Sequence, residues 1–135
     1  MNFNADLHIH SPYSRATSKD MELETLNRWA QLKGLTVIGT GDFTHPLWFS
    51  NLQEKLVEAE NGLFKLKSEY KVSGSEGVPL TCRRDVRFML SAEVSCIYSK
   101  NGRTRKVHNI ILASSFVAVE RINAALSKIG NLRAD

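Results

Sequence analysis

The chain has 135 residues, a formal net charge of +4, 42% hydrophobic residues and 24% charged residues. This length suits one ordinary domain, and the apolar fraction excludes a wholly disordered or fibrous chain. No stretch is long and apolar enough to span a membrane, and the first ten residues lack the charged and apolar regions of a signal peptide. We therefore expect a domain without membrane contact.

Cysteine usage and charge bear on location and partners. The two cysteines, Cys82 and Cys96, form neither a CxxC pair nor a disulfide framework. This usage fits a reducing compartment, so we expect a cytoplasmic protein. A net charge of +4 allows a polyanionic partner without requiring one.

Alternating strands and helices are predicted along the chain. Residues 3–10 alternate apolar and polar side chains, which is typical of a short strand. Thr17 and Asp20 are spaced like a capping box at the start of a helix, and Gly34 stands where that helix should end.

The later elements follow the same alternation. In order, the sequence predicts a buried strand at 35–40, a helix at 48–61, a polar excursion or mobile loop at 66–85, strands at 86–94 and 107–113, and a helix at 116–129 whose inward side chains are Val119, Ile122, Leu126 and Ile129. Asn101-Gly102 lies between the last two strands and is a hairpin signal. The pattern indicates an α/β fold with a largely parallel sheet.

His8 and His10 form an HxH pair on the first predicted strand. Residues two apart on a strand point to the same side, so both imidazoles can reach one point in space. Imidazole is a common ligand of Zn, Fe and Mn, which makes the pair a candidate metal site. The alternative is two histidines on a solvent-facing side of the strand.

Two acids follow apolar strands. Asp42 comes after Gly39-Thr40-Gly41, and Glu93 stands at the end of the next strand. The carboxyl ends of strands build active sites in α/β folds, and an acid there is costly unless it is paired or bound to metal. The alternatives are a turn or helix-cap acid at Asp42 and a structural ion pair with an arginine at Glu93.

The fourth predicted strand is less clear in its chemistry. His108 opens that strand rather than ending it, so a core or surface histidine is the default there. The adjacent turn carries four basic residues, Lys100, Arg103, Arg105 and Lys106. Such a cluster indicates either a solvated hairpin tip or a contact to phosphates.

These segments together resemble a known family. ADLHIHSPYS, KGLTVIGTGDFTHPLW, RFMLSAEVS and VHNIILASS are similar, in this order, to the PHP family, named for polymerase and histidinol phosphatase. The segment from Gly39 to Trp48 and SRATSKDM resemble its endonuclease Q branch, whose members cut DNA beside deaminated bases. Some relatives of that branch are labelled helicase-related.

The resemblance implies a set of metal ligands and catalytic residues. His8 and His10 match the first metal-binding motif, Asp42 the acid of the second, Glu93 the carboxylate that bridges two metals, and His108 the histidine after it. The family's usual histidine of the second motif is replaced by Phe43, which leaves open whether His45 substitutes. The implied cofactors are two or three divalent ions (Zn, Mn or Fe).

The resemblance also implies a partial domain. The family's later ligands have no counterpart, because no histidine follows His108. We expect residues 1–135 to be a partial PHP domain, the N-terminal part of a distorted TIM-like β/α barrel with about four strands, in a longer or truncated protein. Either a homodimer covers the open barrel edges, or the four strands pack as a smaller sandwich-like α/β unit.

The function implied is metal-dependent hydrolysis of DNA phosphodiesters, weak or absent in this chain alone. Arg15, Arg103 and Arg105 are candidate contacts to phosphates, and DNA is the expected partner. One alternative is a metal hydrolase of the amidohydrolase type, whose barrels also begin with HxH. Another is a non-catalytic PHP module that docks a DNA polymerase or helicase.

Overall fold

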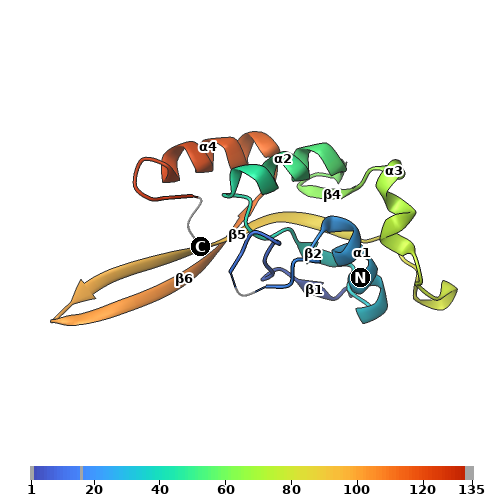
Figure 1. Cartoon of the computed structure of the whole chain (residues 1–135), viewed down its shortest axis with the longest axis horizontal. Coiled ribbons are helices and arrows are strands. Elements are labelled where there is room, and N and C mark those ends of the chain that lie inside the picture. Colours follow the sequence, from blue (N-terminus) through green and yellow to red (C-terminus); the bar gives the residue numbers. More distant parts are fainter. Residues whose placement is uncertain (1, 16, 133–135) are drawn as a thin grey trace.

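The computed structural model describes residues 2–15 and 17–132 and shows a mixed α/β fold (Figure 1). Its strands are β1 (Ala5–Asp6), β2 (Val37–Gly39), β3 (Leu56–Glu60), β4 (Leu63–Leu66), β5 (Arg87–Lys100) and β6 (Arg103–Ala113). Its helices are α1 (Leu23–Lys33), α2 (Pro46–Lys55), α3 (Ser68–Lys71) and α4 (Phe116–Leu126), with short 3-10 turns at Ser73–Ser75 and Leu80–Cys82.

The six strands form one open sheet of order β1-β2-β5-β4-β3, with β6 paired to β5. β1, β2 and β5 run parallel, whereas the β3–β4, β4–β5 and β5–β6 pairs are antiparallel. The expectation of a largely parallel sheet with about four strands is therefore wrong. The expected barrel is not confirmed, because the sheet is open in the part of the chain that the structure describes.

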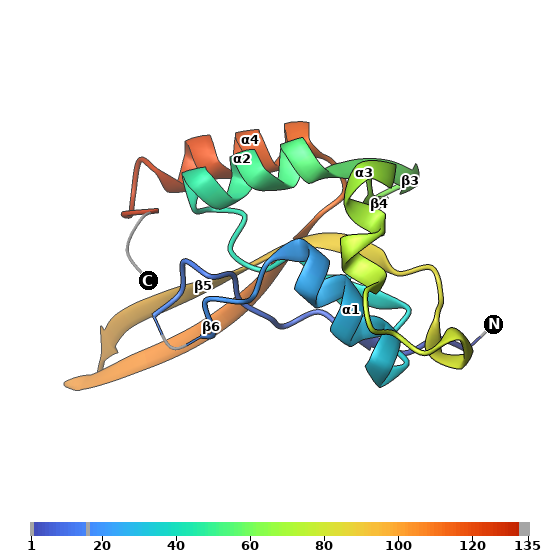
Figure 2. The same ribbon diagram turned by 45° about the vertical axis from the view of Figure 1, so that its right-hand side comes forward.

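Helices α2 and α4 lie side by side on one side of the sheet (Figure 2). The rings of Phe49 on α2 and Phe116 on α4 meet with centroids 6.0 Å apart, and Phe116 also lies 4.8 Å from Phe64 of β4. Trp48 and Phe88 are fully buried in the same core. Burial of these large apolar side chains is the main force that holds both helices on the sheet.

The early elements differ from the prediction at their starts. β1 has only two residues, so His8 and His10 lie beyond the strand on irregular backbone. The capping box is wrong: the residue before α1 is Glu22, and the Thr17 hydroxyl instead donates to the Ser11 and Ser14 carbonyls.

Gly34 ends α1 as predicted. It has φ +73°, and its N–H donates to the Ala30 and Gln31 carbonyls. A residue with a Cβ pays a steric cost at positive φ, which is why glycine is preferred at this position of a helix.

The predicted helix at 48–61 is too long. It ends at Lys55, and β3 and β4 follow as a hairpin. Asn61-Gly62 stands at the turn, where Gly62 has φ +80°. Asn-Gly between apolar runs is a strong hairpin signal. The sequence therefore indicates this turn, but the helical spacing of Leu52 and Leu56 favoured a longer helix in the prediction.

The segment predicted as a polar excursion or mobile loop at 66–85 begins at the last residue of β4 and forms α3 and the two 3-10 turns. The Gly74 carbonyl accepts hydrogen bonds from Asn27 Nδ2 at 2.7 Å and Gln31 Nε2 at 2.9 Å, both on α1. These buried amides attach the excursion to α1 and satisfy polar groups that would otherwise be costly to bury.

The last hairpin is confirmed and is longer than predicted. β5 and β6 pair from Leu90↔Ala113 to Lys100↔Arg103, with Asn101 and Gly102 both at positive φ in the turn. The helix after it ends at Leu126 rather than 129. Val119 is buried as expected, but Ile129 is 84% exposed, so its predicted inward position is wrong.

Two further observations concern the chain as a whole. Cys82 and Cys96 are both free thiols, as the absence of a disulfide framework predicts. Among the described residues, the structure contains no helix of the length and apolarity that crossing a bilayer requires.

The ion pair between Arg87 of β5 and Glu60 of β3 gives a prediction. Arg87 Nε lies 2.6 Å from Glu60 Oε2, and Nη2 lies 2.8 Å from Oε1. The hydrogen bond from Arg87 lowers the pKa of Glu60 from its ordinary value of 4.5. A carboxylate with a lowered folded pKa stabilises the fold above its unfolded pKa and loses this effect as pH falls through the folded value.

We therefore expect Glu60→Gln to lower the Tm modestly at pH 7, and the difference from the parent to shrink as the pH falls below about 4. Thermal melts between pH 7 and about pH 3 measure this. Glu58→Gln, on the same strand, is the matched control, since Glu58 forms no ion pair with any residue in the described ranges. A Tm difference that is constant with pH would contradict the prediction.

Candidate metal centre

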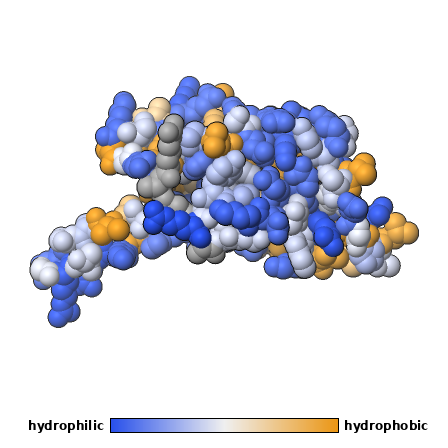
Figure 3. Space-filling view, viewed as in Figure 1, coloured by the Kyte–Doolittle hydropathy of each residue, from blue (hydrophilic) through white to orange (hydrophobic). Residues whose placement is uncertain are grey.

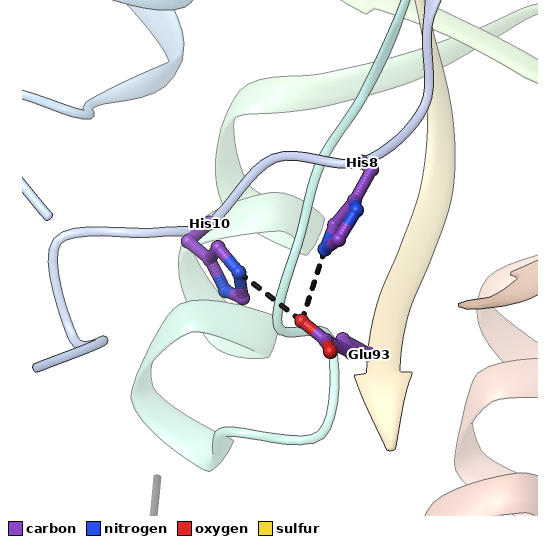
Figure 4. A group of neighbouring side chains, drawn as sticks. All are labelled: His8, His10 and Glu93. Carbon is purple, nitrogen blue, oxygen red and sulfur yellow. Dashed lines mark hydrogen bonds and ion pairs between the residues drawn. The ribbon is translucent and has the colours of Figure 1, made fainter. Parts of the chain in front are cut away.

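Three histidines surround the carboxylate of Glu93, which lies on β5. His8 Nε2 lies 3.0 Å from Glu93 Oε2, and His10 Nε2 lies 3.3 Å from the same oxygen (Figure 4). His108 on β6 contacts the other oxygen, Oε1, through its Nδ1. The two carboxylate oxygens therefore serve different histidines.

His8, His10 and Glu93 form a group that can hold a metal ion. Each offers one ligand atom, and these atoms all lie within 4.8 Å of one another. Two imidazoles and a carboxylate suit Zn, Mn or Fe. The sequence prediction that these three residues come together is confirmed, and His108 extends the cluster on the far oxygen of Glu93.

The electrostatics of the cluster favour an ionised carboxylate. The hydrogen bond from His8 lowers the pKa of Glu93, partial burial opposes this effect, and the contact with His108 adds to the lowering. The Glu93 side chain is 14% exposed, whereas His8 and His108 are each 56% exposed. An ionised carboxylate flanked by accessible imidazoles is the form that binds a cation.

The parallel strands explain why these residues meet. β1, β2 and β5 lie side by side, so the chain that leaves β1 crosses the carboxyl end of β2 and reaches β5. The carboxyl ends of parallel strands meet at one edge of the sheet, where ligand sites form in such folds. His8 and His10 converge from irregular backbone, with ring centroids 5.6 Å apart, rather than from a strand as predicted.

Residues 7–10, which carry both histidines, are called the histidine segment. Two glycines allow this segment to lie against β2. A Cβ on Gly39 would meet the Leu7 carbonyl oxygen at 2.7 Å, and a Cβ on Gly41 would meet the Ile9 carbonyl oxygen at 2.5 Å. Gly41 also has φ +65°. Glycine is therefore required there by both close approach and backbone conformation.

Asp42 lies beside His10 rather than in the three-residue group. Its Oδ1 is 3.2 Å from His10 Nδ1, and its Oδ2 accepts hydrogen bonds from the Ser11 N–H at 2.6 Å and the Ser11 hydroxyl at 2.7 Å. The carboxylate holds the His10 ring with Nε2 towards Glu93. This is how outer-shell carboxylates orient metal-binding histidines. Its predicted role as a direct ligand stays a prediction.

The loop before Asp42 is supported by residues that the sequence analysis did not select. The Ser91 hydroxyl accepts the Gly41 N–H at 2.9 Å, and the Trp48 indole N–H donates to the Gly41 and Thr40 carbonyls at 3.0 and 3.2 Å. No local pattern marks Ser91. Ser91 could have been suspected only from its position two residues before Glu93, which puts both side chains on the same face of the strand. Trp48 could have been suspected only because it follows the Gly-rich loop.

The remaining second-motif residues lie outside the cluster. His45 precedes α2 and stacks on Tyr13, with ring centroids 4.4 Å apart. Phe43, which replaces the histidine of the resembled motif, is fully buried in the core. The structure therefore does not bring either side chain to Glu93, and His45 as a ligand stays a prediction.

The three predicted phosphate-binding arginines are all exposed and come from two separate parts of the chain. Arg15 lies in the turn after the histidine segment. Arg103 and Arg105 lie near the tip of the β5–β6 hairpin, paired with Lys100 and Tyr98. Their role in substrate binding stays a prediction.

A cleft of about 520 Å³ opens beside the cluster. Its lining includes His10, Glu93 and His108 of the cluster, Leu126 at the end of α4, and Ile129 just beyond that helix. This volume is in the range of ligand sites and gives solvent and substrate access to the carboxylate.

The chain is similar to a small number of known proteins. It is 34% identical over 125 residues, 93% of its length, to an uncharacterized protein of Methanocaldococcus jannaschii, of which it spans 12%. It matches the lesion-specific endonuclease Q of Pyrococcus furiosus with a TM-score of 0.71 at 25% identity, over 98% of this chain and 27% of that one. It also matches, with the same TM-score and identity, endonuclease Q in complex with a 27-mer duplex substrate with an abasic lesion at the active site, of which it covers 28%.

The chain is thus related in structure to a fragment of endonuclease Q, a lesion-specific DNA endonuclease. No protein-family model matches it, so membership of the PHP family is not confirmed. The helicase-related label gains no support from these matches.

Gly41 gives a test of how the site is positioned. Gly41→Ala places a methyl group against the backbone of Ile9 and His10 and imposes strain at positive φ. We expect the free energy of unfolding to fall by about 3 kcal/mol and the metal affinity to fall roughly 10- to 100-fold, because His10 is displaced. Urea unfolding and metal titration measure the two effects.

Gly62→Ala is the matched control, because Gly62 has φ +80° but its Cβ would meet only Ser114 at an ordinary 3.5 Å. It carries the conformational strain without the clash, so its metal affinity should equal that of the parent. Equal metal affinity of Gly41→Ala and Gly62→Ala would contradict the proposed positioning by close packing.

Proposed function

We propose that this chain forms the metal-binding part of a DNA endonuclease that acts at damaged sites in duplex DNA. The observation that carries the proposal is the convergence of His8, His10 and His108 on the Glu93 carboxylate, in a fold related to endonuclease Q. The chain spans 27% of that endonuclease. We therefore propose that cleavage requires further residues in addition to residues 1–135.

The contacts support a role for each residue. His8 and His10 would hold a divalent ion together with Glu93, whose Oε2 they contact, and His108, which contacts Oε1, would add a further ligand. Asp42 holds the His10 ring. The donor set suits Zn, Mn or Fe, and a shared carboxylate is compatible with two or more ions.

A divalent ion, when bound by these residues, would lower the pKa of a coordinated water and would offset the charge that builds on phosphoryl oxygens. The protein's own groups set where these effects act. Glu93 is fixed by its histidine contacts, and the cleft leaves room for a phosphodiester beside it. Arg15 is exposed near the histidine segment and is our candidate for a phosphate contact.

Duplex DNA with an abasic lesion is the substrate proposed for the first assay, because a related structure holds that ligand at its active site. Residues 1–135 are proposed as one partial domain, with weak or no cleavage by this chain alone. A cytoplasmic location remains part of the proposal, since both cysteines are free.

A non-catalytic module is the second candidate. Phe43 stands where the resembled motif has a histidine, and its burial in the core removes that position from the site. Such a module would bind metal and stabilise the fold without cutting DNA.

The test is the metal content of the purified chain and of His8→Ala/His10→Ala, measured by elemental mass spectrometry after dialysis against Zn and Mn. We expect near-stoichiometric metal in the parent and a loss of affinity of at least about 100-fold in the double variant, since removal of ligands exceeds the effect of outer-shell changes. His45→Ala is the control and should retain the metal, because His45 lies on Tyr13 rather than on Glu93.

Cleavage is then measured on an end-labelled duplex with one abasic site, with the chain alone and in its full-length context. Metal-dependent cleavage by the parent and none by the double variant supports the endonuclease. Metal binding without cleavage in either context supports the non-catalytic module, and a parent without metal contradicts both.

A further inference from the structure

The outer half of the β5–β6 hairpin leaves the body of the protein as a free two-stranded ribbon (Figure 1). It runs from the Ser95↔His108 pair to the Lys100↔Arg103 pair, and every residue in both segments is exposed. An isolated two-stranded hairpin is at best marginally stable in water. A ribbon of this length with nothing packed against it would gain stability from a bound partner, so it is a candidate binding surface.

The ribbon carries the net charge of the chain. The protein has 18 Lys and Arg residues and 14 Asp and Glu residues. Four of the cations, Lys100, Arg103, Arg105 and Lys106, lie at the ribbon's end, so the remainder of the chain is formally neutral. No acid occurs between Glu93 and Glu120. Figure 3 shows the outer end of this extension as hydrophilic, with apolar surface nearer the body.

The cations lie on both faces of the ribbon. Cross-strand partners share a face and successive pairs alternate, so Lys106, paired with Ile97, is on the face of Glu93. The other three cations, Lys100, Arg103 and Arg105, are on the opposite face. A two-stranded ribbon fits the major groove of B-DNA, where phosphates line both sides. One cation on one face and three on the other, with exposed Tyr98 beside Arg105, match that setting.

The ribbon also leads directly from the metal centre. Glu93 and His108 lie on its inner end, and the cations begin at the Ile97↔Lys106 pair and end at the Lys100↔Arg103 pair. These pairs are about 14 and 24 Å from Glu93 at about 3.4 Å per residue. This span equals about four to seven base pairs of B-DNA.

We infer that the outer β5–β6 ribbon is an arm that binds duplex DNA through its phosphates, about four to seven base pairs from the phosphodiester at Glu93. The position relative to the cut rests on the proposed function, whereas the binding itself does not. The partner follows from charge complementarity: a dense line of phosphates is the polyanion that pairs with four cations and no acids.

The experiment is fluorescence anisotropy of a labelled duplex with the 135-residue chain in EDTA, over a range of salt concentrations. The test variant is Lys100→Gln/Arg103→Gln/Arg105→Gln/Lys106→Gln. If the four side chains contact phosphates, the slope of log K against log salt should fall by about 3 to 4, and the affinity at 0.1 M salt by at least about tenfold.

The matched control is Arg28→Gln/Lys33→Gln/Lys65→Gln/Arg84→Gln. It removes the same charge from exposed positions on α1, β4 and the segment before β5, at the other end of the molecule. It should leave the slope within about one of the parent. Arg103→Lys/Arg105→Lys keeps the charge and should bind like the parent, and circular dichroism verifies that each variant is folded.

The possible outcomes separate this inference from the proposed function. A loss specific to the ribbon variant supports the arm even if the chain never cuts DNA. Equal losses in the ribbon and control variants, or none in either, overturn it even if metal-dependent cleavage is found. A parent that does not bind duplex, but forms a dimer that the ribbon variant dissociates in light-scattering measurements, also overturns it and assigns the ribbon to a second copy of the chain.

Discussion

The pairing of β5 with its neighbours is the constraint on which the rest of the structure depends. β2 and β4 pair with its first half, and β6 pairs with it from Leu90 to the tip. The inner half is buried in the core and fixes the register of the strand. Glu93 and the outer ribbon follow at set distances from that register, because side chains along a strand alternate strictly. A one-residue slip would turn Glu93 away from the histidines.

The metal centre is maintained by close backbone packing at the carboxyl end of β2. Gly39 and Gly41 let the histidine segment approach to distances that a Cβ would forbid. Asp42 then orients His10, and the Ser91 hydroxyl holds the Gly41 N–H. The chemistry of the ligands thus relies on groups that touch no ligand atom of the cluster, as is usual where a site must be held rigidly.

The β5–β6 hairpin combines two proposed roles. Its inner end carries Glu93 and His108, and its outer end carries all of the formal net charge. The charged arm and Glu93 lie on the same pair of strands. DNA bound to the arm would therefore be held at a nearly fixed distance from a metal ion at Glu93. The electrostatic attraction would also raise the rate of encounter with DNA, an effect that salt weakens.

The sequence by itself determined which side chains are available for chemistry, where a helix ends and where a hairpin turns. The HxH pair, the helix end at Gly34 and the hairpin at Asn101-Gly102 depend on residue type and short spacing, and all three are present in the structure. Glu93 follows a buried stretch as predicted, but it lies inside β5, which continues to Lys100, and not at the end of a strand. Only the tertiary structure decided the mixed sheet, the place of Asp42 beside His10, and the separation of His45 from the cluster. The physical reason is range: periodicity reports neighbours within a few residues, whereas His8 and Glu93 are 85 residues apart and meet only because packing of the core brings β1, β2 and β5 together.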